Sequence, residues 1–221
     1  MRWMFQKTPE LVSADEALKG GRAPVLENPR PHPVLGTPIT GPWKEGQKSV
    51  LVGVGCFWGP EQMYWKMDGV ESTSVGYAGG VTANPTYREV CSGRTNHVEV
   101  VEVVYDPEKV SLREIVAVGL EDHDPTQKNR QGNDVGTQYR SAFYTVGDDA
   151  EADKKLIEEM VAQYATALAE KGYGEVTTEI KRLDETDAGE YYRAEDEHQQ
   201  YLHKNPGGYC PTHATGVACA R

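Results

Sequence analysis

The chain has 221 residues, of which 38% are hydrophobic and 26% are charged, so it can bury a substantial core as an ordinary globular protein. Its net charge of −11 argues against nucleic acid as a partner, because phosphate binding requires clustered lysine and arginine. No apolar run approaches the length of a membrane span, and charged residues interrupt the N-terminus before a signal-type stretch could form. We therefore expect a cytoplasmic protein without a membrane partner.

The first 48 residues predict an extended arm laid over the body of the protein. Seven of the thirteen prolines fall within the first 42 residues, in stretches such as NPRPHPVLGTP. Proline fixes φ and lacks a backbone donor, so this segment suits neither a helix interior nor a central strand. We expect residues 49–182 to form the folded core and residues 183–221 to form a tail on the surface, all within one domain.

The first half of the core is expected to contain three strands and two helices. SVLVGVG, residues 49–55, predicts a buried strand, and FWGPEQMYWKM predicts a helix with Pro60 and Glu61 in its first turn. VESTSVGYAGG predicts a second strand, and HVEVVEVVYDP, apolar on both faces, predicts a central one. SLREIVAVGL begins with a capping box of Ser111 and Glu114 and predicts a helix.

The second half continues with a strand in YRSAFYTV, a long amphipathic helix and a short strand in TTEI. Asp148 or Asp149 is expected to cap the long helix, which should end at Gly172. The order is strand, helix, two strands, helix, strand, long helix, strand. It predicts an α+β fold, a ferredoxin-like two-layer sandwich with a mixed sheet.

Cys56 lies at the junction between the first strand and the first helix. A helix N-terminus stabilises a thiolate, so we expect a lowered pKa for this thiol. Gly55 and Gly59 would allow a sharp turn and the close approach of a substrate, while Phe57 and Trp58 suit the wall of a small apolar pocket. Free cysteine is also a common buried residue. Local composition therefore leaves the reactive and the structural interpretation of Cys56 equally open.

The other cysteines bear on that choice. The total of four is too few for a disulfide scaffold, and no C-x-x-C pair occurs. Cys210 and Cys219 lie in GGYCPTHATGVAC, which has no apolar periodicity to bury them, and thiols on a flexible segment can exchange with another thiol. Zinc binding by the tail is the competing interpretation, but with His203 and His213 the spacing fits no common site. Cys91 precedes a Ser-Gly turn and is expected to be structural.

Glu99 is the candidate proton donor. It shares a strand face with two valines, and burial raises the pKa of a carboxyl toward neutrality. The alternative is a solvated position at the strand end. Tyr87 and Tyr139 could supply phenolic hydrogen bonds, although with twelve tyrosines any one is more often a packing residue. Asp134 lies in a turn-rich segment with many amide side chains, and such loops often carry sites.

Together these motifs resemble those of peptide methionine sulfoxide reductases of the A type. The motifs run in order from about Ser49 to Cys219, and they are GCFWG, GYAGG, NPTYREVCSG, HVEVV, HDP, RQGND-x-GTQYRS, HQQYLHKNP and GYC. Two departures stand out. Gly119 and Leu120 replace aromatic residues that usually precede HDP, and Asn96 replaces the glycine of a T-G-H sequence. Neither touches the residues expected to carry the chemistry.

The resemblance implies that Cys56 attacks the sulfoxide sulfur of the S epimer of methionine sulfoxide and becomes a sulfenic acid. It also implies that protonated Glu99, with the hydroxyls of Tyr87 and Tyr139, binds and protonates the sulfoxide oxygen. The substrate would be a free or a peptide-bound sulfoxide, and the function would be the repair of oxidised proteins.

In the same resemblance, Phe57 and Trp58 enclose the substrate methyl group and Asp134 orients the substrate backbone. Cys210 and then Cys219 carry the disulfide to the surface for thioredoxin, or for dithiothreitol in vitro. No metal or organic cofactor is implied, and we expect a monomer. The alternatives are a thiol peroxidase and a non-catalytic redox-sensing module.

Overall fold

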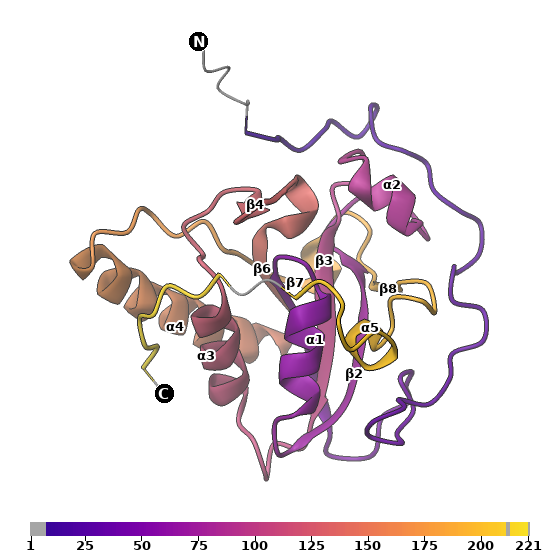
Figure 1. Ribbon diagram of the computed structural model, residues 1–221, viewed down its shortest axis with the longest axis horizontal. Helices are drawn as coiled ribbons and strands as arrows, with labels where there is room; N and C mark the ends of the chain where they lie inside the picture. Colours follow the sequence, from indigo (N-terminus) through magenta and orange to yellow (C-terminus); the bar gives the residue numbers. More distant parts are fainter. Residues whose placement is uncertain (1–7, 211–212, 221) are drawn as a thin grey trace.

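A computed structural model describes residues 8–210 and 213–220 of the chain (Figure 1). Its elements in chain order are β1 (Lys48–Val54), α1 (Trp58–Trp65), β2 (Val70–Ala78), α2 (Tyr87–Cys91), β3 (Val98–Tyr105), α3 (Leu112–Asp122), β4 (Arg130–Gln131), β5 (Asp134–Val135), the 3-10 helix η1 (Thr137–Tyr139), β6 (Ser141–Thr145), α4 (Ala150–Glu170), β7 (Glu179–Arg182), the 3-10 helix η2 (Leu183–Glu185), β8 (Tyr192–Arg193) and α5 (Tyr201–Lys204).

The centre of the molecule is a six-stranded sheet with the order β7-β6-β1-β3-β2-β8. Neighbouring strands from β6 to β8 are antiparallel, whereas β6 and β7 are parallel. The chain leaves β1, crosses through α1 to β2 and returns as β3 between them. The predicted mixed α/β class is confirmed, and most of the sheet is antiparallel.

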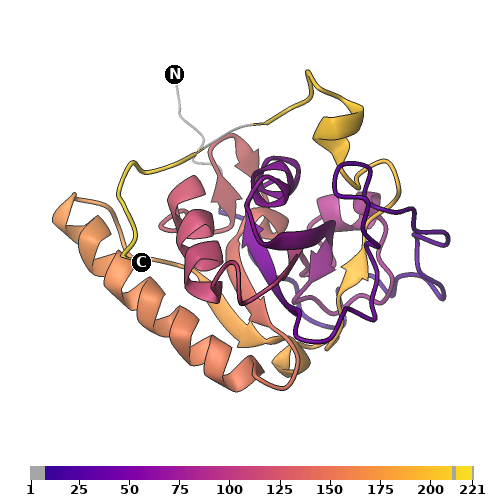
Figure 2. The same ribbon diagram turned by 90° about the horizontal axis from the view of Figure 1, so that it is seen from below.

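The helices cover one face of this sheet. Side chains alternate along a strand, so Val101 and Val103 of β3 face one way while Val98 and Val100 face the other. The first face packs against α1, α3 and α4 in one large cluster. The second face packs against Leu183 and the chain that follows it. In Figure 2 the long helix α4 and the N-terminal arm lie at opposite ends of the molecule.

The predicted helix starts are largely confirmed. Ser111 and Glu114 form the capping box of α3, and Pro60 lies in the first turn of α1. Asp149 stands at the N-cap position of α4, but its side chain caps no backbone group. Its carboxylate instead accepts a hydrogen bond from Lys48 Nζ, with an N–O distance of 2.7 Å. The expected side-chain cap is therefore replaced by an ion pair with the start of β1.

Several short elements were not expected from the sequence: α2, the β4–β5 hairpin, β8 and α5. The chain beyond residue 183 is also more than a surface tail. β8 pairs with β2 at the edge of the sheet, and Ala194, Gln199 and Gln200 are buried. This part of the chain completes the core, because its polar side chains bond to backbone groups of the body: Gln199 Oε1 accepts from the Val75 amide at 3.0 Å.

The departure at Gly119 has a packing reason. A Cβ atom at this position would lie 2.6 Å from the Tyr64 hydroxyl and 3.2 Å from Val52 Cγ1. The same hydroxyl donates to the Ile115 carbonyl of α3 at 3.1 Å. Glycine therefore lets α3 lie directly against β1 and α1, which fixes the position of the helices behind the turn that contains Cys56.

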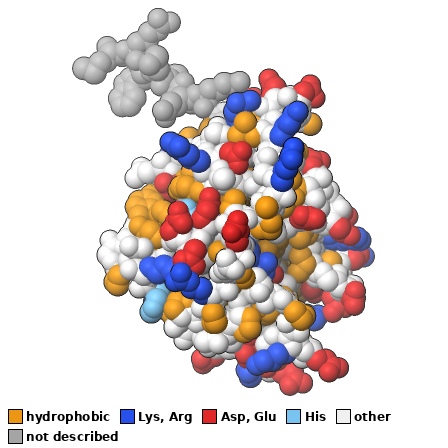
Figure 3. Space-filling view, turned by 90° about the vertical axis from the view of Figure 1, so that its right-hand side faces the viewer, with side chains coloured by type: hydrophobic (Ala, Val, Ile, Leu, Met, Phe, Trp, Pro, Cys, Tyr) orange, Lys and Arg blue, Asp and Glu red, His pale blue; other side chains and the backbone are white. Residues whose placement is uncertain are grey.

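Residues 8–47 contain no helix or strand in the part the structure describes, apart from an isolated bridge between Gly20 and Ala83. On the face shown in Figure 3, lysine and arginine are interspersed with aspartate and glutamate. Within the described ranges, no helix is both long and apolar enough to cross a bilayer.

Candidate active site

Cys56 lies in the turn that joins β1 to α1, as the sequence predicts, and it is partly buried. Gly55 just before it has φ +102°, a conformation that favours glycine. A Cβ atom at Gly55 would also lie 2.9 Å from Gln131 Cγ. The glycine is therefore required both by the turn and by the close approach of the β4–β5 hairpin.

The expectation of a lowered thiol pKa is wrong for the protein without substrate. Burial raises the pKa of Cys56 well above its usual value, and the nearby Glu99 carboxylate raises it further. A backbone hydrogen bond from Trp58 lowers this pKa but does not outweigh the first two effects. The free-energy cost of removing a thiolate from water is larger here than the stabilisation that the helix N-terminus gives it. Cys56 is therefore a thiol at neutral pH.

Glu99 is buried on the helix face of β3, with 1% of its surface exposed. Its Oε2 accepts the Phe57 backbone N–H at 3.3 Å, whereas its Oε1 has no hydrogen-bond partner among the described residues. Burial raises the pKa of Glu99 to about 8, and the charge of Asp134 contributes to the rise. The solvated alternative is excluded, and the side chain carries a proton at pH 7.

Tyr87 and Tyr139 stand near this carboxyl. Burial raises the pKa of both phenols, and the Glu99 charge is the second cause for each. Both hydroxyls are therefore neutral donors at physiological pH. Glu195 holds Tyr87 in place, because its carboxylate accepts the Tyr87 amide at 2.8 Å and the Tyr77 hydroxyl at 3.1 Å.

An aromatic box lies beside Cys56. Phe57 is buried, and the Trp58 ring stacks on Tyr201 with 4.0 Å between ring centroids. His198 lies 5.8 Å from the Trp58 ring and 4.2 Å from the Tyr87 ring. Sequence reasoning did not single out His198 or Tyr201, although HQQYLHKNP contains both. The signal was weak because these rings reach Trp58 only through the tertiary fold.

Asp134 and the first tail cysteine also reach this end of the sheet. Both Asp134 carboxylate oxygens accept from the Tyr209 hydroxyl at 3.2 Å. Asp134 and Cys210 are among the charges that raise the pKa of Cys56, so both lie near it. Cys210 itself is exposed. Tyr209, which the sequence analysis did not single out, thus links the chain just before Cys210 to the β4–β5 hairpin.

Cys219 differs from the expectation of an exposed tail thiol. It is buried, with 7% of its surface exposed, in the cluster formed with α3 and α4. Its backbone N–H donates to Glu121 Oε1 at 2.8 Å, and the Tyr164 hydroxyl donates to the Val217 carbonyl at 3.1 Å. Lack of periodicity did not prevent burial, because a few backbone contacts dock the end of the tail on the helices.

Cys91 lies near Tyr87, and its expected structural role stays a prediction. It is exposed at the end of α2, and its thiol is hydrogen-bonded to the Tyr87 hydroxyl. His203 and His213, considered above as zinc ligands, belong to no group of three metal-ligating side chains within the part of the chain that the structure describes.

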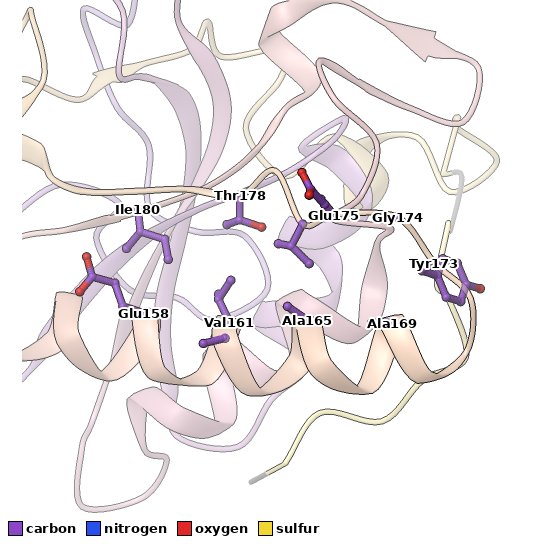
Figure 4. A pocket seen from close by; sticks show the side chains of 11 residues that line it. Glu158, Val161, Ala165, Ala169, Tyr173, Gly174, Glu175, Thr178 and Ile180 are labelled. Atoms are coloured by element: carbon purple, nitrogen blue, oxygen red, sulfur yellow. The ribbon is translucent and has the colours of Figure 1, made fainter.

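An open groove of about 680 Å³ lies elsewhere, along α4 (Figure 4). Val161 and Ala165 of α4 line one side, and Thr178 and Ile180 line the other. The groove is lined by no cysteine or histidine among the described residues, so it offers no thiol or imidazole.

Comparisons with known proteins agree with this geometry. A model of the family described as peptide methionine sulfoxide reductase matches residues 48–219. The enzyme of that name from Corynebacterium efficiens is 66% identical over 220 residues, which is 99% of this chain and 98% of the relative. A solved methionine sulfoxide reductase A of Corynebacterium diphtheriae has 60% identity and a TM-score of 0.88, covering 96% of this chain and 98% of that chain.

A solved structure of Mxr1 from Saccharomyces cerevisiae in complex with Trx2 is also similar. It has 25% identity and a TM-score of 0.50, and the match covers 79% of this chain and 93% of that chain. Because the family model and the relatives cover the strands, the nucleophile junction and the tail together, the chain belongs to the peptide methionine sulfoxide reductase family and is an oxidoreductase.

Proposed function

We propose that the chain reduces the S epimer of methionine sulfoxide to methionine, with Cys56 as nucleophile and Glu99 as proton donor. The observation that carries this proposal is the buried Glu99 carboxyl, whose Oε1 has no partner among the described residues. When Glu99 is ionised, its charge raises the pKa values of Cys56, Tyr87 and Tyr139. A neutral acid between a thiol and two phenols suits an acceptor oxygen that gains negative charge.

The proposed step moves one oxygen atom and two electrons. Glu99 gives its proton to the sulfoxide oxygen, and the Cys56 sulfur attacks the sulfoxide sulfur. The S–S bond formed in this attack and the S–O bond of the substrate then break as the protonated oxygen bonds to the Cys56 sulfur, so Cys56 is oxidised from thiol to sulfenic acid while the sulfoxide is reduced to a thioether. The Glu99 carboxylate recovers a proton from the Cys56 thiol. Its pKa near 8 suits both giving and taking a proton around neutral pH.

The proposed recognition explains the choice of epimer. Phe57, Trp58 and Tyr201 would enclose the methyl group, and Asp134 with Tyr209 would bind the substrate backbone. With the methyl group in the box and the sulfur facing Cys56, only one configuration points its oxygen at Glu99. A box that fits a thioether methyl also favours a sulfoxide over a peroxide as oxidant.

The function is tested with separated S and R sulfoxides of a methionine peptide. We expect the protein, with thioredoxin as reductant, to convert the S epimer and to leave the R epimer unchanged. The measurement is the amount of methionine peptide formed with time, by chromatography. Equal conversion of both epimers, or of neither, would contradict the proposal.

We propose that Cys210 and Cys219 recycle Cys56. The Cys210 thiol condenses with the sulfenic acid, a disulfide forms and water leaves. Cys219 then attacks the Cys210 sulfur and releases the Cys56 thiol, so that thioredoxin reduces the Cys210–Cys219 disulfide. The Mxr1 complex with Trx2 supports thioredoxin as the reductant. Because Cys219 is docked on the helices, the relay requires the end of the tail to detach.

Replacing Cys210 by serine tests this order. We expect Cys210→Ser to form about one methionine per protein and then to stall with thioredoxin, because the sulfenic acid has no resolving thiol. With dithiothreitol, which can reach the sulfenic acid directly, turnover should continue. Cys219→Ser is the matched variant, and it should lose more turnover with thioredoxin than with dithiothreitol. Many fast turnovers of Cys210→Ser with thioredoxin would contradict the relay.

We further propose a monomeric cytoplasmic protein of one domain with a ferredoxin-like core and no resident cofactor. The strand order, in which β3 lies between β1 and β2, supports the core assignment. The thiols and carboxyl described above supply every group that the proposed reaction uses, with thioredoxin as the source of electrons.

A further inference from the structure

Residues 8–21, here named the strap, cross two loops that carry side chains of the active site. The first loop, residues 79–97, contains α2 with Tyr87. The second loop, residues 123–140, contains the β4–β5 hairpin with Asp134 and η1 with Tyr139. Figure 1 shows α2 and β4 beyond the same end of the sheet, with the start of the arm passing above them.

The strap binds the first loop on both sides of α2. After the helix, the Asn96 side chain accepts the Val12 amide at 2.9 Å and donates to the Val12 carbonyl at 2.8 Å. The Leu18 amide donates to the Arg94 carbonyl at 2.9 Å. Before the helix, the Gly21 amide donates to the Ala83 carbonyl at 2.9 Å. Further bonds run from the Thr82 hydroxyl to the Leu18 carbonyl at 2.8 Å and from the Arg94 guanidinium to the Glu16 carbonyl at 3.0 Å, so the strap holds both ends of the segment that carries Tyr87.

The strap binds the second loop through Asn129. The Asn129 side-chain amide donates to the Pro9 carbonyl at 2.7 Å, and the residue is buried, with 7% of its surface exposed. Its own carbonyl accepts the Gly136 amide at 3.0 Å, which closes the β4–β5 hairpin. The Gly136 carbonyl in turn accepts the Tyr139 amide at 3.1 Å. A continuous chain of bonds thus leads from the strap to Tyr139.

Asn96 and Asn129 have a second feature in common. Their φ angles are 59° and 53°, in the left-handed region where glycine is the least strained residue. Glycine would satisfy the backbone at either position, but only a carboxamide supplies the bonds to Val12 and Pro9. At both positions, the side chain is needed for the strap rather than for the turn.

We propose that the strap holds the two loops in a fixed relation, and that Asn96 and Asn129 are positioning residues for the sulfoxide site. The inference rests on the proposed function, in which Tyr87 and Tyr139 bind one oxygen atom from opposite loops. The sheet fixes the position of Glu99, whereas the two tyrosines lie on separate loops. Contacts with the strap are therefore needed to fix the position of one loop relative to the other. Rate falls steeply when groups that bind the transition state are displaced.

The test compares Asn96→Gly, Asn129→Gly and the double variant in the full chain. Each single variant is expected to lower kcat for the S sulfoxide by roughly three- to tenfold, with KM changed by less than about twofold, because the aromatic box is untouched. The double variant should be no slower than the worse single variant, since the bonds of Asn96 to Val12 and of Asn129 to Pro9 are successive links in one connection between the two loops. If the two substitutions acted independently, the double variant would instead lower kcat by the product of the two single reductions.

Asn84→Gly is the matched control. Asn84 also has a left-handed φ of 43°, but its side chain makes only one long bond to the strap, to the Gly21 carbonyl at 3.4 Å, and the shorter bond from the Gly21 amide to the Ala83 carbonyl at 2.9 Å remains without it. In Asn84→Gly, glycine increases the conformational freedom of the unfolded chain as much as it does in the two test variants. We expect its kcat to stay within about twofold of the wild-type value.

A readout independent of activity is hydrogen exchange at the Gly136 amide. Releasing the strap at Asn96 should speed this exchange about tenfold, although Asn96 lies in the other loop, and Asn84→Gly should not. Unchanged exchange, unchanged kcat in both single variants, or multiplied effects in the double variant would each overturn the strap proposal. An inactive wild-type protein would instead overturn the proposed function. The hydrogen-exchange rates would still show whether the strap couples the two loops.

Discussion

Cys56→Ser is expected to reduce methionine formation to background, a loss on the order of 10⁴-fold or more. A serine hydroxyl in the same buried turn is neither acidic enough nor nucleophilic enough to attack the sulfoxide sulfur. Of the other thiols, Cys219 is buried on the helices, Cys91 is hydrogen-bonded to Tyr87, and Cys210 is assigned above to the recycling step. The measurement is methionine formed in a single turnover without reductant, which isolates the first chemical step from recycling.

Cys91→Ser is the matched control for that experiment. Cys91 is an exposed thiol hydrogen-bonded to the Tyr87 hydroxyl, and serine keeps an acceptor for that bond. We expect the single-turnover rate to stay within about threefold of the wild-type rate. Loss of activity in Cys91→Ser with retention in Cys56→Ser would reverse the assignment of the nucleophile.

The sequence was sufficient for features that depend on neighbouring residues. The Cys56 junction follows from a Val-rich strand next to a helix start, and Glu99 follows from alternation along β3. Two valines on the same face favoured its burial, but a solvated position at the strand end stayed open until the fold was known. Glu102, which points to the other face, is also buried, but Arg193 pairs with it at 2.6 Å. Alternation alone did not distinguish the unpaired carboxyl from the paired one.

Properties that depend on the whole fold could not be obtained in this way. The pKa of Cys56 is governed by burial under the hairpin and by Glu99, which is distant in the sequence. Cys219 is buried by contacts with Glu121 and Tyr164 rather than by a pattern in its own segment. Local rules therefore singled out Cys56 and Glu99 as candidates but gave the wrong direction for the shift in the thiol pKa.

Glu61 illustrates the same point. Its place in the first turn of α1 suggested a partner for the helix dipole, but it is fully buried, and burial raises its pKa to about 8. It accepts bonds from the Gln200 backbone at 2.9 Å and side chain at 2.8 Å, across 139 residues of sequence. These two hydrogen bonds hold Gln200, which has a left-handed φ of 47°. They thereby position His198 and Tyr201 next to the Trp58 ring.

Glu99→Gln is expected to slow methionine formation roughly 10²- to 10⁴-fold in a single turnover, because glutamine keeps the shape and a hydrogen-bond donor but cannot transfer a proton. The pH dependence should change as well. With a pKa raised to about 8, Glu99 is protonated below that pH, so the wild-type rate should hold at neutral pH and fall above pH 8. Each further unit removes about tenfold of the protonated form. The variant should lack this alkaline fall.

Alkylation of Cys56 should respond in the opposite direction. The Glu99 charge contributes to the raised pKa of this thiol, so its removal in Glu99→Gln should increase the thiolate fraction at pH 9. Iodoacetamide should therefore modify Cys56 faster in the variant, as measured by peptide mass spectrometry, while sulfoxide reduction becomes slower.

Glu102→Gln is the control on the same strand, because Glu102 is buried on the opposite face and pairs with Arg193. It should weaken the fold but keep the alkaline fall and a rate within about threefold of wild type. If Glu99→Gln retained both the wild-type rate and the fall above pH 8, another group would have to supply the proton. Faster alkylation at pH 9 with slower reduction at pH 7 would separate two effects of Glu99: its charge above about pH 8 suppresses the Cys56 thiolate, and its proton at neutral pH is given to the sulfoxide oxygen.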